Sequence, residues 1–277
     1  MDQLPAVLVG IVFALHVLGE RRAVALTGRP RRREARQRAV TFYAALFIIL
    51  VALESPIDSL SDQLFWVHMI QHLLLLVAAA PLIVISRPWM SIWRPLPLGL
   101  RRRVARTAAC ARYLAPGRAL LRLLAMPVAA WCAFNVNLVI WHLPGPYDLT
   151  LRSAAVHVLE HTSFLAFGIL FWAQVAACPP ARTTLTYGRR IALLAASAIP
   201  NIGLSIFLAF AQHPLYSHYA ELAHRPGGIT ALADQQIGAG LMWTVGDLPF
   251  AIAIGLLIQR WLIQQERRAT TVGTSLT

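Results

Sequence analysis

Residues 64–85 have the sequence LFWVHMIQHLLLLVAAAPLIVI, in which every residue from Leu73 to Ile85 is apolar. A predominantly apolar run of this length can cross a bilayer as one α-helix, which needs about 20 residues. Two histidines, His68 and His72, interrupt the run near its start. Polar side chains are costly inside a membrane, so this pair is a candidate functional site.

Apolar runs of similar kind recur along the chain, at residues 4–19, 39–53, 123–143, 154–177, 191–211 and 237–258. Of the 277 residues, 57% are hydrophobic and only 13% are charged, against about 25% charged in soluble domains. We therefore predict an all-α integral membrane protein, with residues 1–277 forming a single polytopic domain built as a seven-transmembrane helix bundle. The first run follows Asp2 and precedes an arginine cluster, so we expect a retained anchor rather than a cleaved signal.

The arginines predict the orientation of this bundle. Eight of the 25 lie between Arg21 and Arg38 and nine between Arg87 and Arg122, whereas the loops on the opposite side contain only Arg152 and Arg225. The positive-inside rule then places the N-terminus outside and the C-terminus in the cytoplasm. Because the net charge of +13 is divided into blocks between spans, we expect contact with the lipid bilayer and none with nucleic acid.

A second histidine pair repeats the spacing of the first, in the sequence His157-Val-Leu-Glu160-His161. Residues four apart lie on one face of a helix, with Cβ atoms about 5–6 Å apart. Both predicted helices enter from outside, so both pairs should lie roughly 5–12 Å below the outer end. We therefore predict an outward-facing metal site whose ligands are His68, His72, His157, His161 and His142.

Other polar or soft side chains of the spans and outer loops could support such a site. Asn135 lies two helical turns before His142, and methionine thioethers are soft ligands that favour Cu(I). The three cysteines are too scattered for a thiol site. The predicted supporting or gating residues are Glu160, Asp234, Asn135, Met69, Met242 and Asp247.

An ordered series of motifs resembles one family. The series comprises His68-Met-Ile-Gln-His72 with Ala80-Pro81-Leu82, Trp141-His142-Leu-Pro144 with Tyr147-Asp148, His157-Val-Leu-Glu160-His161, Pro200-Asn201, Asp234-Gln235-Gln236, and Met242-Trp243 with Gly246-Asp247. It resembles the CtaG family of bacterial multi-span cytochrome c oxidase assembly proteins, over about residues 64–255. The resemblance implies a non-enzymatic protein of the bacterial plasma membrane that helps to mature a haem–copper oxidase, with oxidase subunits as partners. From the chemistry and position of the histidines we infer copper, and with it an extracytoplasmic copper donor as a further partner.

We accordingly predict a copper-binding assembly factor, and three alternatives stay open. His157-Val-Leu-Glu160-His161 also fits the H-x-x-E-H pattern of inverted zinc peptidases, which allows a membrane-embedded zinc hydrolase with Glu160 or Asp234 as base. One histidine from each pair could instead bind haem in an electron carrier. The third alternative is a metal-free assembly scaffold.

Overall fold

The computed structural model describes residues 4–27, 33–178 and 185–274, with side chains for all of these except 27 and 269–274. Over these ranges the chain is helical and contains no strand. The long helices are α1 (Leu4–Thr27), α2 (Arg33–Glu54), α11 (Ala154–Ala176), α12 (Tyr187–Ala209) and α15 (Leu248–Thr274).

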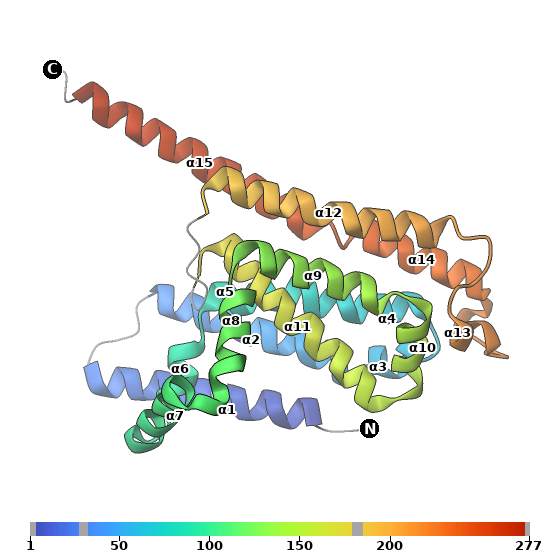
Figure 1. Cartoon of the computed structure of the whole chain (residues 1–277), viewed down its shortest axis with the longest axis horizontal. Helices are drawn as coiled ribbons and strands as arrows, with labels where there is room; N and C mark the ends of the chain where they lie inside the picture. Colours follow the sequence, from blue (N-terminus) through green and yellow to red (C-terminus); the bar gives the residue numbers. More distant parts are fainter. Residues whose placement is uncertain (1–3, 28–32, 179–184, 275–277) are drawn as a thin grey trace.

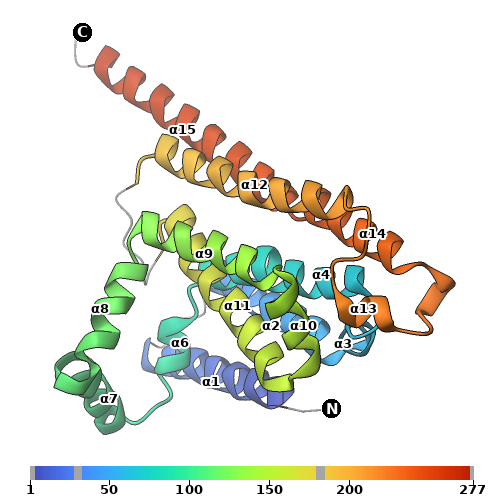
Figure 2. The same cartoon turned by 45° about the vertical axis from the view of Figure 1, so that its right-hand side comes forward.

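The helices form two groups that lie side by side (Figure 1). α12, α14 (Ala231–Thr244) and α15 run along one side of the molecule, and α2, α4 (Phe65–Leu73), α9 (Pro127–Trp141) and α11 form the main body beside them. Figure 2 shows α7 (Leu98–Cys110) and α8 (Ala115–Leu124) projecting from this body near α6 (Trp89–Trp93). Short helices α3 (Pro56–Ser61), α10 (Pro144–Arg152) and α13 (Ser217–Glu221) cover the opposite end.

Six helices of the described residues are long and apolar enough to span a membrane, or seven if one bent pair is counted as a span. The bent pair joins residues Arg112–Leu124 to α9 at 91°. The helix that carries the predicted span 123–143 therefore starts at Pro127, because proline lacks an N–H and restricts the residue before it. With 15 residues, α9 is only about 22 Å long.

Other boundaries also differ from the prediction. α1 and α2 extend well beyond 4–19 and 39–53. The arginines beside these runs end the apolar sequence, but arginine is a good helix former and the helices continue through it. The predicted span 237–258 is interrupted between Thr244 and Leu248. Pro249 cannot donate a helical hydrogen bond there.

The third span changes its helical pitch just after the histidine-bearing segment, where it packs against α11. Its middle, η1 (Leu74–Ala79), is a π-helix between α4 and α5 (Ala80–Ser86). The N–H of Ala80 bonds the Leu75 carbonyl, and Pro81 has no N–H to offer the carbonyl of Leu76. The indole of Trp172 on α11 donates to that carbonyl at 3.0 Å instead. The two helices that carry the histidine pairs are thereby joined.

Small residues let neighbouring helices approach closely. A Cβ on Gly168 of α11 would lie 3.0 Å from the Cβ of Ala80, and one on Gly238 of α14 would lie 2.4 Å from the Phe65 ring. Ala239 is fully buried beside Gly238, whereas Gly240 faces open space. Close packing along this helix therefore involves the first two of these three small residues.

Pro200 lies inside α12 without ending it. The next residue, Asn201, crosses to the break between α14 and α15: its side-chain amide donates to the Met242 carbonyl at 2.9 Å and to Oδ1 of Asp247 at 3.1 Å. Asp247, predicted as a supporting residue, is thus the partner of Asn201.

Candidate metal centre

The two histidine pairs face each other across the interface of α4 and α11. Ring centroids are 5.1 Å apart for His68 and His157, 5.8 Å for His68 and His161, and 5.5 Å for His72 and His161. The i, i+4 spacing places each pair on one helix face. The structure therefore brings together the four imidazoles that the sequence pairs only locally.

Glu160 lies between the pairs. Its Oε2 is 3.4 Å from Nε2 of His68 and its Oε1 is 3.4 Å from Nε2 of His72, and the carboxylate is fully buried. We expected Glu160 to support the ligands from outside, yet its position makes it a candidate ligand.

These donor atoms form a compact set. His68, His157, Glu160 and His161 each offer one ligand atom, and the four atoms lie within 4.8 Å of one another. Ligands bound at about 2.0–2.2 Å lie no more than about 4.4 Å apart. Small side-chain rotations would close that difference, so the four residues can address one ion.

The carboxylate of Glu160 lies 3.4 Å from Nε2 of His68 and of His72 but forms no hydrogen bond of ordinary geometry with either. Three further buried nitrogens have no hydrogen-bond partner among the described residues: Nδ1 of His72, Nε2 of His157 and Nε2 of His161. A buried polar atom without a partner costs about 1–3 kcal/mol, and native proteins contain few of them. A neutral imidazole offers one nitrogen lone pair to a metal, so a group of imidazoles around a buried carboxylate is suited to a cation.

Hydrogen bonds behind two of the rings leave Nε2 free to coordinate. Nδ1 of His142 lies 2.7 Å from the Leu138 carbonyl, which can only accept, so Nδ1 carries the proton and the lone pair of Nε2 lies 3.3 Å from Sδ of Met69. Nδ1 of His68 lies 3.4 Å from the hydroxyl of Tyr219. That hydroxyl donates to the Ser61 carbonyl. In the tautomer that carries its proton on Nδ1, His68 can donate to the same hydroxyl and offer the lone pair of Nε2 to an ion bound beside Glu160.

Two tyrosines complete this outer layer, and the sequence did not single them out as site residues. Tyr147 of α10 and Tyr219 of α13 lie with their hydroxyls 3.4 Å apart above His68. Burial raises the pKa of both hydroxyls well above the ordinary value, so both stay protonated and can donate. Tyr147 forms part of a quoted motif, whereas Tyr219 lies in an outer loop without any local signal.

Asp148 fixes the helix that carries Tyr219. Its carboxylate accepts hydrogen bonds from the N–H groups of Ser217 and His218 and from the hydroxyl of Ser217, at 2.6–3.2 Å. α13 is thereby held over the histidine cluster as a cover.

Asp234, predicted as a supporting or gating residue, anchors the helix of the first pair. Its two carboxylate oxygens accept the N–H groups of Phe65 and Trp66 at 2.9 and 3.0 Å. α4 has no N-cap side chain of its own, so this residue of α14 caps it from outside. Asp234 therefore positions His68 and His72 and is not itself within the ligand set.

The remaining predicted residues divide between the cluster and the packing. Met69, Met242, His72 and His142 line a small cavity of about 20 Å³ beside the cluster, roughly the space that one water occupies. Asn135 instead donates to the Trp131 carbonyl at 2.8 Å and contacts Ser197 of α12 at 3.5 Å. It therefore joins two helices and does not orient an imidazole.

Fold and site together define a helical membrane protein with a buried histidine–carboxylate cluster at one end of its bundle. The family model described as the cytochrome c oxidase caa3 assembly factor, Caa3_CtaG, matches residues 7–264. The chain belongs to this family. The match extends over the first two spans, where the motifs offered no resemblance.

Curated relatives are uncharacterized mycobacterial proteins. The chain is 25% identical over 216 residues to a protein of Mycobacterium bovis and to one of Mycobacterium tuberculosis, covering 78% of this chain and 32% of each relative. It is 24% identical over 240 residues to a protein of Mycobacterium leprae, covering 84% of this chain and 35% of that relative. The chain thus spans about a third of the length of these relatives. No solved structure matches it.

Proposed function

We propose that this chain binds a copper ion at the cluster of His68, His72, His157, Glu160 and His161 and releases it to a haem–copper oxidase during assembly. The observation that carries the proposal is the convergence of buried imidazole and carboxylate donor atoms from α4 and α11 on one point. Membership of an oxidase assembly family supplies the recipient. The site would lie toward the outer face of the plasma membrane, where an extracytoplasmic donor could load it.

The donor atoms favour copper as the cargo. Imidazole sites bind Cu(II) more strongly than other divalent first-row ions, and a thioether adds preference for Cu(I). His142 and Met69 offer such a nitrogen and sulfur pair 3.3 Å apart, next to His72. A cuprous ion could therefore pass between the cluster and this softer pair.

Exchange requires access to a buried site. His157 is the partly exposed member of the ligand set, whereas His68, Glu160 and His161 are buried. We infer that copper reaches the cluster past His157, at the edge of the cover formed by α10 and α13.

A zinc hydrolase is less well supported by the same geometry. Such an enzyme needs a carboxylate base that is free to act on water. Glu160 lies among the candidate ligands, and both oxygens of Asp234 accept backbone N–H groups. Neither carboxylate is free for the role.

The proposal is tested in cells that depend on this protein for their oxidase. Cells carrying His68→Ala/His72→Ala/His157→Ala/His161→Ala should contain oxidase with reduced copper and activity, at unchanged levels of the assembly protein. A His213→Ala/His224→Ala variant removes histidines from the loop after α12, outside the cluster, and should behave as wild type. Oxidase with normal copper content in the quadruple variant would overturn the proposal.

A further inference from the structure

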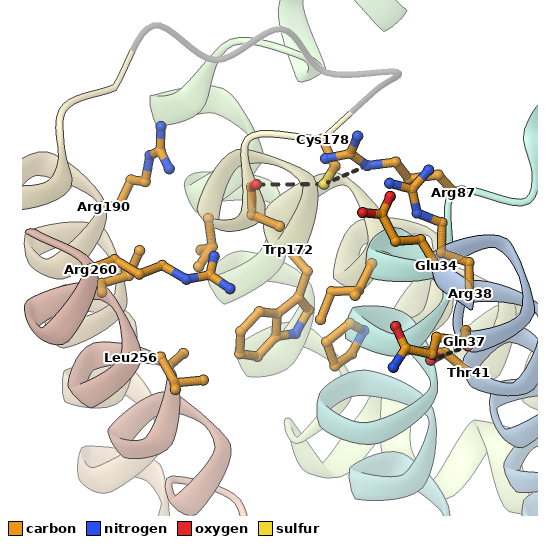
Figure 3. Close-up of a pocket in the computed structure, with 16 residues that line it drawn as sticks. Glu34, Gln37, Arg38, Thr41, Arg87, Trp172, Cys178, Arg190, Leu256 and Arg260 are labelled. Atoms are coloured by element: carbon orange, nitrogen blue, oxygen red, sulfur yellow. Dashed lines mark hydrogen bonds between the residues drawn. The ribbon is translucent and has the colours of Figure 1, made fainter. Parts of the chain in front are cut away.

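A second candidate site lies at the opposite end of the bundle, far from the histidines. A cavity of about 440 Å³ opens there between α2, α5, α11, α12 and α15. This volume falls within the range of about 300–1,000 Å³ that is typical of small-ligand sites. Figure 3 shows its lining residues.

Four arginines from four different segments line this cavity: Arg38 of α2, Arg87 after α5, Arg190 of α12 and Arg260 of α15. The lining contains a single carboxylate, that of Glu34. Within the described parts of the chain, none of the four guanidinium groups forms an ion pair. Four positive charges and one negative charge leave the lining with an excess of positive charge, so the cavity is suited to an anion.

The arginines also keep donors available. Nε of Arg87 donates to Sγ of Cys178 at 3.2 Å, and Nε of Arg190 donates to the Leu185 carbonyl at 3.0 Å. Each of these bonds uses one of the five N–H groups of a guanidinium. The terminal N–H groups therefore remain free to bind the oxygens of a phosphate, for which arginine is well suited.

The inner wall of the cavity is apolar. It is formed mainly by Ile85, Trp172, Val175, Leu256 and Leu257. The ligand that matches both parts has an anionic head and an apolar tail. The arginine distribution assigns this end to the cytoplasmic side, where a bilayer presents such molecules.

We propose that this cavity binds an anionic phospholipid, with the phosphate held by Arg38, Arg87, Arg190 and Arg260 and an acyl chain against Trp172 and Leu256. The bound lipid fills the space between α2 and α11 on one side and α12 and α15 on the other. It thereby links the two helix groups at the end away from the histidine cluster. The proposal does not depend on the copper function.

The test uses the full chain in detergent, freed of lipid and titrated with phosphatidylglycerol or phosphatidylcholine, with bound lipid counted by native mass spectrometry. Wild type should bind one phosphatidylglycerol at least tenfold more tightly than phosphatidylcholine. Arg38→Gln/Arg260→Gln should weaken phosphatidylglycerol roughly thirty-fold, since each arginine contributes about 1 kcal/mol toward anionic lipid. Arg38→Lys/Arg260→Lys, which keeps the charge, should recover most of the binding.

The matched control is Arg102→Gln/Arg106→Gln, which removes two exposed arginines of α7 outside the cavity and should leave the affinity within twofold of wild type. Equal binding of the two lipids, or equal losses in the cavity and control variants, would overturn the proposal. Displacement of the lipid by inorganic phosphate at similar concentrations would also overturn it, because the site would then recognise a free anion. Helical circular dichroism of every variant establishes that it is folded.

Discussion

Replacing Asp234 tests the residue that caps α4 without changing any candidate metal ligand. The carboxylate accepts the N–H groups of Phe65, which is buried, and Trp66, which is partly buried. Hydrogen bonds to a charged group contribute about 1.5–3 kcal/mol each, and loss of an N-cap costs about 0.5–2 kcal/mol. Two such hydrogen bonds amount to about 3–6 kcal/mol and the N-cap loss alone to about 0.5–2 kcal/mol, so Asp234→Ala should lower the free energy of unfolding by an intermediate amount, about 2–4 kcal/mol. Asp234→Asn, which keeps one acceptor oxygen, should cost about half as much.

The assay is unfolding of the purified protein by SDS in mixed micelles, followed by far-UV circular dichroism. Asp62→Ala is the matched control, because it removes the same charge three residues before α4 from an exposed side chain, and should stay within about 0.5 kcal/mol of wild type. Asp234→Ala should also weaken copper binding about tenfold or more, since it loosens the start of the helix that carries His68. Equal stability of the two alanine variants would refute this explanation of the cap.

Three further substitutions test contacts around the cluster. Tyr219→Phe should lower copper affinity about 10–100-fold in a chelator competition, because it removes the hydroxyl that orients His68. Its control is Tyr43→Phe, which removes another hydroxyl hydrogen-bonded to a histidine, at 3.2 Å from His16; this variant should leave the copper affinity unchanged. Gly168→Ala should cost about 1–3 kcal/mol in the same SDS titration through overpacking, whereas Gly203→Ala adds a Cβ into open space and should be neutral or stabilising. Trp172→Phe should cost about 1–3 kcal/mol of stability because it leaves the Leu76 carbonyl without its indole donor. Trp131→Phe, which loses an Nε1 that has no hydrogen-bond partner, should cost less. A larger loss for Trp131→Phe than for Trp172→Phe would contradict the role given to the Trp172 hydrogen bond.

The sequence predicts the helical membrane class and the pairing of histidines well, because both depend on local patterns. A run of apolar residues reports a span whatever surrounds it, and the i, i+4 spacing fixes two rings on one face. The equal depth of the two histidine pairs could be predicted because both spans enter the membrane from the outer side, so counting residues from that end gives the depth of each pair. The contact between the rings of His68 and His161 depends on tertiary structure. It is established by the packing of α11 against η1 and α5, the segments that continue the span of α4.

Other features could not be predicted because they depend on distant partners. Asp234 caps a helix 169 positions away, and no local pattern distinguishes such a carboxylate from a ligand. Tyr219 contacts His68 from a loop whose path is set by Asp148. The break before Pro127 was missed because a hydropathy average does not register the lost N–H of a proline or its restriction of the preceding residue, and here α9 begins at that proline.

The most direct test of the central claim is the metal content of the purified protein. Wild type loaded with copper and passed through a desalting column should retain one copper per chain. The His68→Ala/His72→Ala/His157→Ala/His161→Ala variant should retain none, while His213→Ala/His224→Ala retains the wild-type amount. Stoichiometric copper in the quadruple variant, or a wild type that retains zinc in preference to copper when offered both, would contradict the account.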